Sequence, residues 1–382
     1  MLSLRGDTLD SRDLPIAGAP TLGLGTDERG LDRLSIVRRE VNGDPWLWIP
    51  FPGWAVAVSP DGAPLARLQV GIRANYLIPP PGPRLFESGI QTYLDSPRLE
   101  FGDVDGDGRT DVIASARYEL RVFLQREDGS FGESPDRVQP LRRISESDHL
   151  RGSGAVRVQI ADANGDDRAD VIVSYLSGGL TDIRTRTTLH LNRGGGFDLD
   201  VADHAFETDD SWVSDWLIDT DGDARPEWVR AKVSLSLFEL IEVLLTRSLD
   251  AELEVYRQDS ESGFEREPFE RRELSLPYSF DTYRPRGFIP TLEEDLNGDG
   301  QLDLLASGAG GKLEVFLGGP TRRLRRRDAT QELDTRGRIR FGDLNGDSLP
   351  DFLIFDPRRP DASLRIARNT GSLASGGVPS TD

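Results

Sequence analysis

Five short segments of the sequence place acidic side chains at one fixed spacing. In each segment position 1 is Asp, position 3 is Asp or Asn, position 4 is Gly, position 5 is Asp, and position 9 is Asp or Glu. An apolar residue follows position 9 in every copy. The segments start at Asp103, Asp162, Asp219, Asp295 and Asp343. Because a hard cation such as Ca²⁺ prefers oxygen ligands crowded in a tight loop, the pattern predicts five calcium sites.

Each loop must supply several of the roughly six to eight oxygens that Ca²⁺ takes, and water completes the set. We expect side-chain oxygens from positions 1, 3, 5 and 9, and the backbone carbonyl from position 7. The loops starting at Asp162 and Asp219 are expected to be the weaker ones, since they carry Asp167 and Ala224 at position 6. The predicted ligand residues are Asp103, Asp105, Asp107, Arg109 and Asp111; Asp162, Asn164, Asp166, Arg168 and Asp170; Asp219, Asp221, Asp223, Arg225 and Glu227; Asp295, Asn297, Asp299, Gln301 and Asp303; and Asp343, Asn345, Asp347, Leu349 and Asp351.

Two other interpretations of these loops were weighed. Asp-Gly and Asn-Gly pairs also form hairpin turns that bind no metal. An EF-hand loop would continue to a Glu at position 12 inside a helix. Here the residues from position 9 onward, such as 111–115 and 351–355, have the apolar character of strands. Five copies of one pattern favour calcium loops over plain turns.

Each loop belongs to a longer repeat. An alternating apolar and polar segment follows each loop and runs into a turn, as in 120–131 and 187–197, which is typical of a strand and hairpin. Four antiparallel strands in about 60 residues is the size of a propeller blade. A degenerate copy starts at Glu40, where position 9 is Trp48, a side chain that cannot bind a metal.

The predicted fold is therefore all-β: a β-propeller of four-stranded antiparallel blades, with six blades favoured and seven as the alternative. We expect a single propeller domain over 14–370, a flexible N-terminus over 1–13 and a flexible tail over 371–382. A segment around 14–25 is expected to add the last strand to the final repeat. The repeats are expected at roughly 33–72, 97–145, 155–208, 212–277, 286–333 and 337–370.

The amino-acid composition narrows the range of possible partners and chemistries. The formal net charge of −20, from 66 acidic and 46 basic residues, argues against nucleic acid or anionic lipid as partner. The absence of cysteine excludes thiol chemistry, and no apolar stretch is long enough to insert in a membrane. The first residues show no signal peptide. Arginine supplies every basic residue except Lys232 and Lys312, which indicates a GC-rich bacterial genome.

The segments 101–115 and 341–355 resemble the FG-GAP/VCBS repeat family, whose calcium-loop propeller repeats also occur in integrin α-chains. The resemblance covers about 33–370. It implies a β-propeller with one Ca²⁺ in each intact blade, a secreted or cell-surface location, and a protein or glycan partner. We therefore expect a non-catalytic, calcium-binding, extracellular module for adhesion or scaffolding.

Two alternatives remain open. A polysaccharide lyase would use Tyr278, Tyr283, Arg284 and Arg286, and a structural component of a surface assembly would need no ligand. We expect no catalytic role for the three histidines, His149, His190 and His204. The six tryptophans are expected to fill space between blades rather than to stack on sugars; they are Trp46, Trp48, Trp54, Trp212, Trp216 and Trp228.

Overall fold

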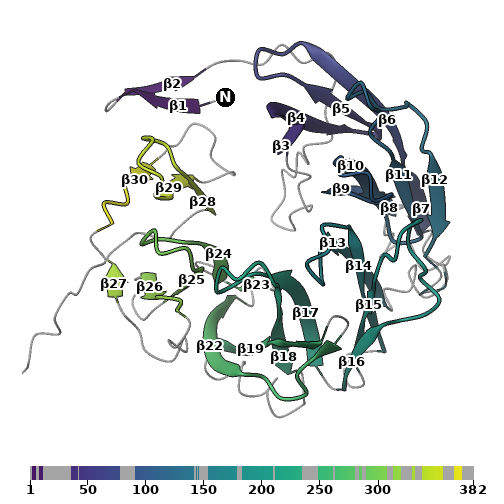
Figure 1. Cartoon of the computed structure of the whole chain (residues 1–382). Coiled ribbons are helices and arrows are strands. Elements are labelled where there is room, and N and C mark those ends of the chain that lie inside the picture. Colours follow the sequence, from purple (N-terminus) through teal and green to yellow (C-terminus); the bar gives the residue numbers. More distant parts are fainter. Residues whose placement is uncertain are drawn as a thin grey trace, which may run out of the picture. The chain divides into compact units, whose positions relative to one another are not determined.

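The computed structural model falls into two compact units, one of residues 14–209 and one of residues 1–13 with 210–382. Within the described ranges every regular element is a β-strand (Figure 1). The structure describes residues 2–5, 8–11, 36–41, 43–77, 91–141, 143, 145, 154–178, 183–209, 211–234, 248–260, 263–279, 284–285, 290–307, 313–319, 329–331, 338–355 and 365–371.

The unit of residues 14–209 contains three four-stranded antiparallel sheets and one two-stranded ribbon. In each sheet the strands follow one another in chain order, as expected for a meander. The sheets are β3 (Val37–Val41), β4 (Asp44–Phe51), β5 (Gly53–Val58) and β6 (Pro64–Gly71); β9 (Arg98–Gly102), β10 (Asp111–Ser115), β11 (Glu119–Phe123) and β12 (Arg137–Pro140); and β13 (Ala155–Ala161), β14 (Asp170–Ser177), β15 (Arg184–His190) and β16 (His204–Asp209). The ribbon pairs β7 (Arg73–Leu77) with β8 (Gln91–Asp95).

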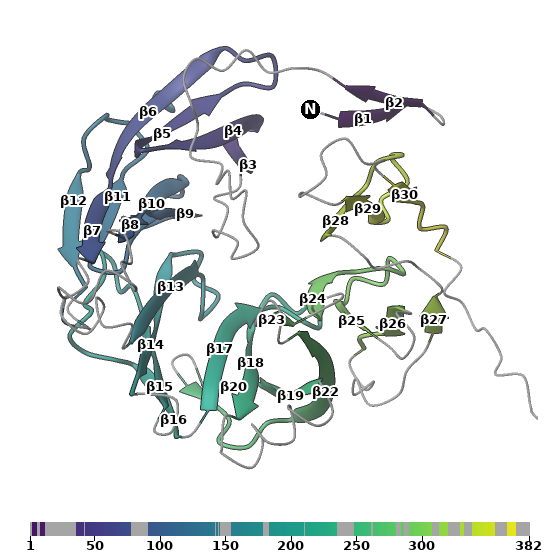
Figure 2. The same cartoon turned by 180° about the vertical axis from the view of Figure 1, so that it is seen from behind.

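The other unit contains sheets of five, four and three described strands (Figure 2). They are β17 (Ser211–Ile218), β18 (Glu227–Ser234), β19 (Ser248–Tyr256), β22 (Glu270–Ser279) and β23 (Arg284–Pro285); β24 (Thr291–Glu294), β25 (Asp303–Ser307), β26 (Leu313–Phe316) and β27 (Ala329–Gln331); and β28 (Arg338–Gly342), β29 (Asp351–Phe355) and β30 (Arg365–Ala367). Two ribbons accompany them, β1 (Leu2–Arg5) with β2 (Thr8–Ser11), and β20 (Gln258–Ser260) with β21 (Gly263–Phe264).

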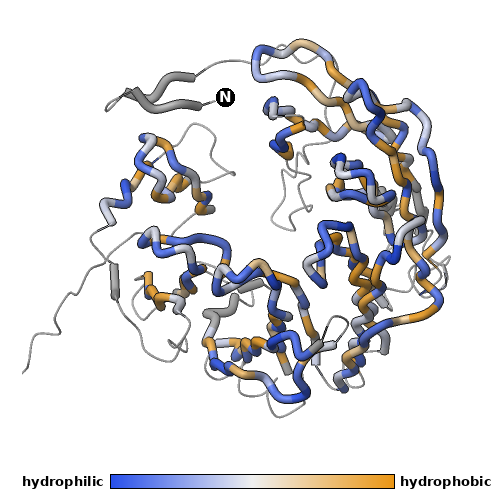
Figure 3. Tube along the Cα trace, viewed as in Figure 1, coloured by the Kyte–Doolittle hydropathy of each residue, from blue (hydrophilic) through white to orange (hydrophobic). Residues whose placement is uncertain are grey.

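Apolar side chains fill the space between consecutive sheets of each unit. Trp48 and Phe123 meet in the core between the β3–β6 and β9–β12 sheets, and Ile113 and Val171 lie in the core between the next two. In the other unit Val229 belongs to the core that joins the first two sheets. Figure 3 shows apolar residues along the strands and hydrophilic residues in many of the loops. Face-to-face packing of successive antiparallel sheets is blade packing, which confirms the predicted all-β propeller class. The described residues form six such sheets of three or more strands, three in each unit, as expected for six blades.

The segment 40–48 folds as a plain hairpin. Val41 pairs with Asp44, so the connection between β3 and β4 has two residues, and Gly43 has a φ of 83°. Trp48 lies in β4, fully buried. The weak match to the acidic pattern therefore marks a strand, a tight turn and a strand, without the long loop of the other repeats.

Some predictions concern residues that lie wholly or partly outside the described ranges. The closing strand expected around 14–25 lies outside the described residues. The segment 1–13, expected to be flexible, contains the β1–β2 hairpin. Among the described residues no helix has the length and apolar character to cross a bilayer.

One face of the β17–β22 sheet carries a row of alternating charges. Asp215 lies opposite Arg230, Arg230 opposite Glu254, and Glu254 opposite Arg271 on successive strands. The Arg230 Nε donates to Asp215 Oδ1 at 2.7 Å, and the Arg271 Nη2 donates to Glu254 Oε1 at 3.0 Å. The first three of these side chains are almost fully buried, while Arg271 is half-exposed. Ion pairs in such surroundings stabilise the sheet only while each charge keeps its partner.

Candidate metal centres

Each acidic loop connects the first two strands of its sheet. The loops join β9 to β10, β13 to β14, β17 to β18, β24 to β25, and β28 to β29. The residue at position 9 begins the second strand and pairs with the residue just before position 1, as Asp111 does with Gly102. The paired strands therefore hold both ends of each loop close together.

The Asp at position 1 organises the loop in all five copies. Its two oxygens accept hydrogen bonds from the backbone N–H groups of positions 4 and 6, over N–O distances of 2.6 to 2.9 Å. The Asp at position 5 accepts the N–H of position 7 in every copy, at 2.8 to 3.0 Å. The loops thus share one backbone conformation, and the predicted carbonyl ligand at position 7 stays a prediction.

The acid at position 9 is buried in every copy. One carboxylate oxygen accepts the N–H of position 2 at 2.8 to 3.1 Å. In four copies the other oxygen accepts an N–H from beyond the third strand of the same sheet, at 2.7 to 2.9 Å. The buried acids are Asp111, Asp170, Glu227, Asp303 and Asp351.

Burial of these acids changes their proton affinity. It raises the pKa of Asp111 to about 6, that of Asp170 to about 7 and that of Asp303 to about 6, although backbone N–H donors act in the opposite direction. Burial also raises the pKa of Glu227. These carboxylates therefore resist ionisation unless a positive charge is close by.

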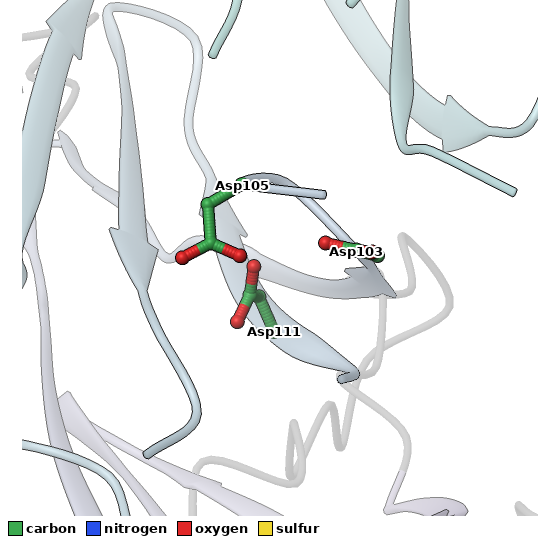
Figure 4. A group of neighbouring side chains, drawn as sticks. All are labelled: Asp103, Asp105 and Asp111. Atoms are coloured by element: carbon green, nitrogen blue, oxygen red, sulfur yellow. The ribbon is translucent and has the colours of Figure 1, made fainter. Parts of the chain in front are cut away.

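The acid at position 3 supplies the clearest candidate metal ligand. In the loop starting at Asp103, oxygens of Asp103, Asp105 and Asp111 lie within 4.8 Å of one another (Figure 4). The Oδ1 atom of Asp105 is buried and accepts no hydrogen bond. The pKa of Asp105 is raised, mainly by burial and to a smaller extent by the neighbouring charge of Asp107. A site built only of hard oxygen donors, with one buried oxygen lacking a donor, fits a divalent cation such as Ca²⁺.

The loop starting at Asp219 has the same arrangement. Oxygens of Asp219, Asp221 and Glu227 lie within 4.8 Å of one another, and the Oδ1 of Asp221 is buried without a hydrogen-bond partner. We expect this loop to be weak because of position 6, and its affinity stays a prediction. The structure nevertheless brings its carboxylates together as closely as those of the Asp103 loop.

The other three loops have Asn at position 3. The amides of Asn164, Asn297 and Asn345 each donate to the Oδ2 of the Asp at position 5, at 2.9 to 3.3 Å. Each amide oxygen also accepts the N–H of position 5. These loops therefore contain three acids and one neutral amide oxygen at the predicted ligand positions, and among the described residues their three acids do not come within 4.8 Å of one another as in the other two loops.

Position 6 has a positive φ in every copy. Gly108 and Gly300 adopt it without strain, at 81° and 84°. Asp167, Ala224 and Ser348 adopt it at 63°, 65° and 67°, which is unfavourable for residues with a Cβ. The same loop conformation is thus more costly in three of the five copies.

Successive loops lie against one another within each unit. A Cβ on Gly106 would meet the Arg168 side chain at 3.1 Å, and a Cβ on Gly298 would meet Leu349 at 3.3 Å. Position 7 of one loop therefore covers the position 4 glycine of the loop before it. This contact adds a second reason for glycine at position 4.

The residue two positions after the third strand was not predicted to have a role. Gln125, Asn192, Gly318 and Asn369 occupy this place, and each donates its backbone N–H to the position 9 acid of its own repeat. The local sequence feature that could have marked this position is an Asn with glycine two residues later, in 192–194 and 369–371. The side-chain partners of Asn192 and Asn369 are the carbonyl groups of Val104 and Leu296, which lie in other repeats and so could not be predicted from local sequence.

The remaining candidate residues have structural places or lie outside the description. His190 is buried, with its ring nitrogens 2.8 Å from the Val201 carbonyl oxygen and 2.9 Å from Thr188 Oγ1. Trp48 and Trp228 are fully buried. His149, Tyr283 and Arg286 are outside the described residues, as are the side chains of Trp212, Tyr278 and Arg284.

The fold and the loops define a class of protein: an all-β repeat protein whose propeller blades carry acidic loops between their first two strands. Residues 103–173 and 295–354 match the family model of the FG-GAP-like repeat. This match confirms the resemblance inferred from the loop pattern.

No curated protein matches the chain. Among solved structures, the chain is similar to a lectin of Agrocybe aegerita that specifically recognises non-reducing terminal N-acetylglucosamine. The identity is 13%, the match covers 75% of this chain and 87% of the lectin chain, and the TM-score is 0.33. A similarity this low carries no argument about fold or ligand.

Proposed function

We propose that this protein is a non-catalytic binding or scaffold module whose acidic loops hold Ca²⁺. The buried Oδ1 of Asp105, which has no hydrogen-bond donor and lies among the carboxylates of Asp103 and Asp111, is the observation that carries the proposal. Bound Ca²⁺ would neutralise these carboxylates. The chain's own part is to hold the carboxylates in place through the backbone N–H groups described above.

Calcium is preferred over softer metals because the ligand set is oxygen alone. Histidine is not part of any of the five loops, and cysteine is absent from the chain. Extracellular calcium modules bind at about 0.1–1 mM, far above cytosolic calcium. If the loops bind in this range, the protein works outside the cell, at a surface or after secretion.

The partner is proposed to be a protein or a glycan. FG-GAP-like repeats support a binding or scaffold role, and the strongly negative net charge of −20 disfavours nucleic acid. A non-catalytic role is supported by His190, whose ring is occupied by carbonyl and hydroxyl contacts inside its sheet.

Titration calorimetry on the chelator-stripped protein tests the proposal, with thermal melts in parallel. We expect about five ions bound, one per loop, and a rise in melting temperature because the ions bind only the folded state. The variant Asp105→Ala should lose about one ion. Glu127→Ala, which removes an exposed acid from a nearby turn, is the matched control and should lose none. Absence of binding at millimolar calcium would refute the calcium proposal.

A further inference from the structure

Asn192 bridges two neighbouring acidic loops. Its side-chain Nδ2 donates to the carbonyl oxygen of Val104 at 2.7 Å, across 88 residues of sequence. Its backbone N–H donates to Asp170 Oδ1 at 2.7 Å. Asn192 is 1% exposed, so water does not compete for these bonds. One residue therefore connects position 2 of the first loop to position 9 of the next.

The connection continues to the acid of the first loop. Val104 donates its own N–H to Asp111 Oδ2 at 2.8 Å. A relay of three hydrogen bonds thus runs from the Asp111 carboxylate through Val104 and Asn192 to the Asp170 carboxylate. The Ala169 N–H, next to Asp170, adds a direct bond to the Asp103 carbonyl at 2.7 Å.

Asn369 makes the same relay in the other unit. Its Nδ2 donates to the Leu296 carbonyl at 2.7 Å, and its backbone N–H donates to Asp351 Oδ1 at 2.9 Å. Leu296 in turn donates to Asp303 Oδ2 at 2.8 Å. The relay connects the loops starting at Asp295 and Asp343.

The junction between the Asp219 and Asp295 loops has no such relay among the described residues. Gly318 occupies the equivalent place and donates its N–H to Asp303, but it has no side chain with which to reach back. A Cβ there would overlap the carbonyl oxygen of Leu302. A single bond of 3.2 Å, from the Leu302 N–H to the Thr220 carbonyl, spans this junction instead.

Gln125 completes the comparison. It holds the equivalent place in the Asp103 repeat, where the preceding repeat has only the two-residue turn after Val41. The Gln125 Nε2 is buried without a partner. The relay therefore occurs where this position is Asn and the preceding repeat also has an acidic loop. The regions 103–173 and 295–354, which match the FG-GAP-like repeat, each contain both loops of one pair.

We infer that Asn192 and Asn369 act as positioning residues that couple the loops in two pairs. The loops starting at Asp103 and Asp162 take up Ca²⁺ as one cooperative pair, those starting at Asp295 and Asp343 as another, and the loop starting at Asp219 binds independently. The inference rests on the proposed function, since it concerns the regulation of the same sites.

The relay couples the loops because it joins groups whose positions bound Ca²⁺ would fix. A cation in one loop would hold its position 9 acid, which accepts the N–H of the residue at position 2. The carbonyl oxygen of that residue orients the Asn side-chain amide, and the backbone N–H of the same Asn orients the acid of the partner loop. The second ion therefore binds a loop that is already ordered, which raises its affinity.

Hydrogen exchange of the full chain during a calcium titration gives a midpoint for each loop. Peptides covering 103–111, 162–170, 219–227, 295–303 and 343–351 report the five sites. The variant Asp166→Ala removes an exposed ligand from the second loop. In the wild-type background it should raise the midpoint of 103–111 by roughly fivefold or more, the lower end of typical coupling between sites. In an Asn192→Ala background the same change should leave that midpoint unmoved.

The other pair is the control and the replicate. Asp166→Ala should leave the midpoints of 295–303 and 343–351 unchanged. Asp347→Ala, tested with and without Asn369→Ala, should reproduce the effect in that unit even if Asn192→Ala fails to fold. If the loops gain protection with calcium but neither ligand variant moves its neighbour's midpoint, the pairing is wrong and the proposed function stands. If no loop responds at millimolar calcium, the proposed function fails as well.

Discussion

Two position 4 glycines allow the contact between neighbouring loops to be measured directly. Gly222 and Gly346 hold the same place in their loops, belong to the same unit, and have φ values of 76° and 85°. A Cβ on Gly222 would lie 2.6 Å from the Gly300 carbonyl oxygen, whereas a Cβ on Gly346 would meet nothing within 4 Å. Replacement by alanine therefore imposes the same backbone strain at both sites, but crowding at only one.

The expected destabilisation follows from these two contributions. Alanine in the left-handed region costs roughly 1–2 kcal/mol, partly offset by about 0.4–1 kcal/mol from its smaller entropy in the unfolded chain. Gly346→Ala should therefore lower the free energy of unfolding by about 1 kcal/mol. Gly222→Ala adds an overlap with backbone that cannot rotate away, which costs about 1–3 kcal/mol more.

Urea unfolding of the chelator-treated variants, followed by tryptophan fluorescence and circular dichroism, measures the difference. The denaturation midpoints should shift while the slopes stay constant, because the area exposed on unfolding does not change. The reasoning is refuted if the two variants differ by less than about 0.5 kcal/mol, since the backbone strain cancels and only the loop contact remains.

Three further predictions concern other features. Ala224→Gly should raise the free energy of unfolding by about 0.5–1 kcal/mol in a thermal melt, because glycine relieves its positive φ; no gain would show that the loop relaxes in solution. Burial raises the pKa of Asp170 to about 7, so the metal-free folded state binds the Asp170 proton more tightly than the unfolded chain does. The contribution of this carboxyl group to the free energy of unfolding should therefore fall as the pH rises from about 4 to about 7. Asp170→Asn in melts with chelator should remove that dependence. Asp215→Ala should lower the free energy of unfolding, measured in urea, by about 3–5 kcal/mol, because it removes the nearest acid from the buried Arg230. Asp209→Ala, which breaks an exposed ion pair, should lower it by less than about 1 kcal/mol.

Local patterns explain why much of the fold could be predicted from the sequence. The acidic spacing, the apolar run that follows it and the alternation after that run are set by neighbours within about one hairpin. They correctly predicted the strands on both sides of each loop, the four-stranded sheets and the FG-GAP-like repeats. The tryptophans were expected to fill space between blades; Trp48 is fully buried in the core between two sheets, and Trp228 is fully buried as well.

Features that depend on distant partners were missed. Asn192 reads as a turn residue until the sheets place it beside Val104, 88 residues away. The burial of Arg230 and Glu254 could not be predicted, because a sequence shows alternation but not whether both faces of a sheet are covered. The segment 40–48 was expected to be a degenerate copy, and it does begin a four-stranded sheet, but Glu40 and Asp44 belong to paired strands rather than to one loop.

The two-residue turn between β3 and β4 bears on the order of folding. The β3–β6 sheet closes its first hairpin without an acidic loop, and Trp46, Trp48 and Phe131 gather in the core that it shares with the next sheet. No crowded carboxylates oppose its collapse, so this sheet needs no cation to assemble. If the other loops hold Ca²⁺ as proposed, a chain made where calcium is scarce would still carry one preformed apolar surface onto which the next sheet condenses. The repeat without an acidic loop is thus suited to form first, ahead of the repeats that carry one.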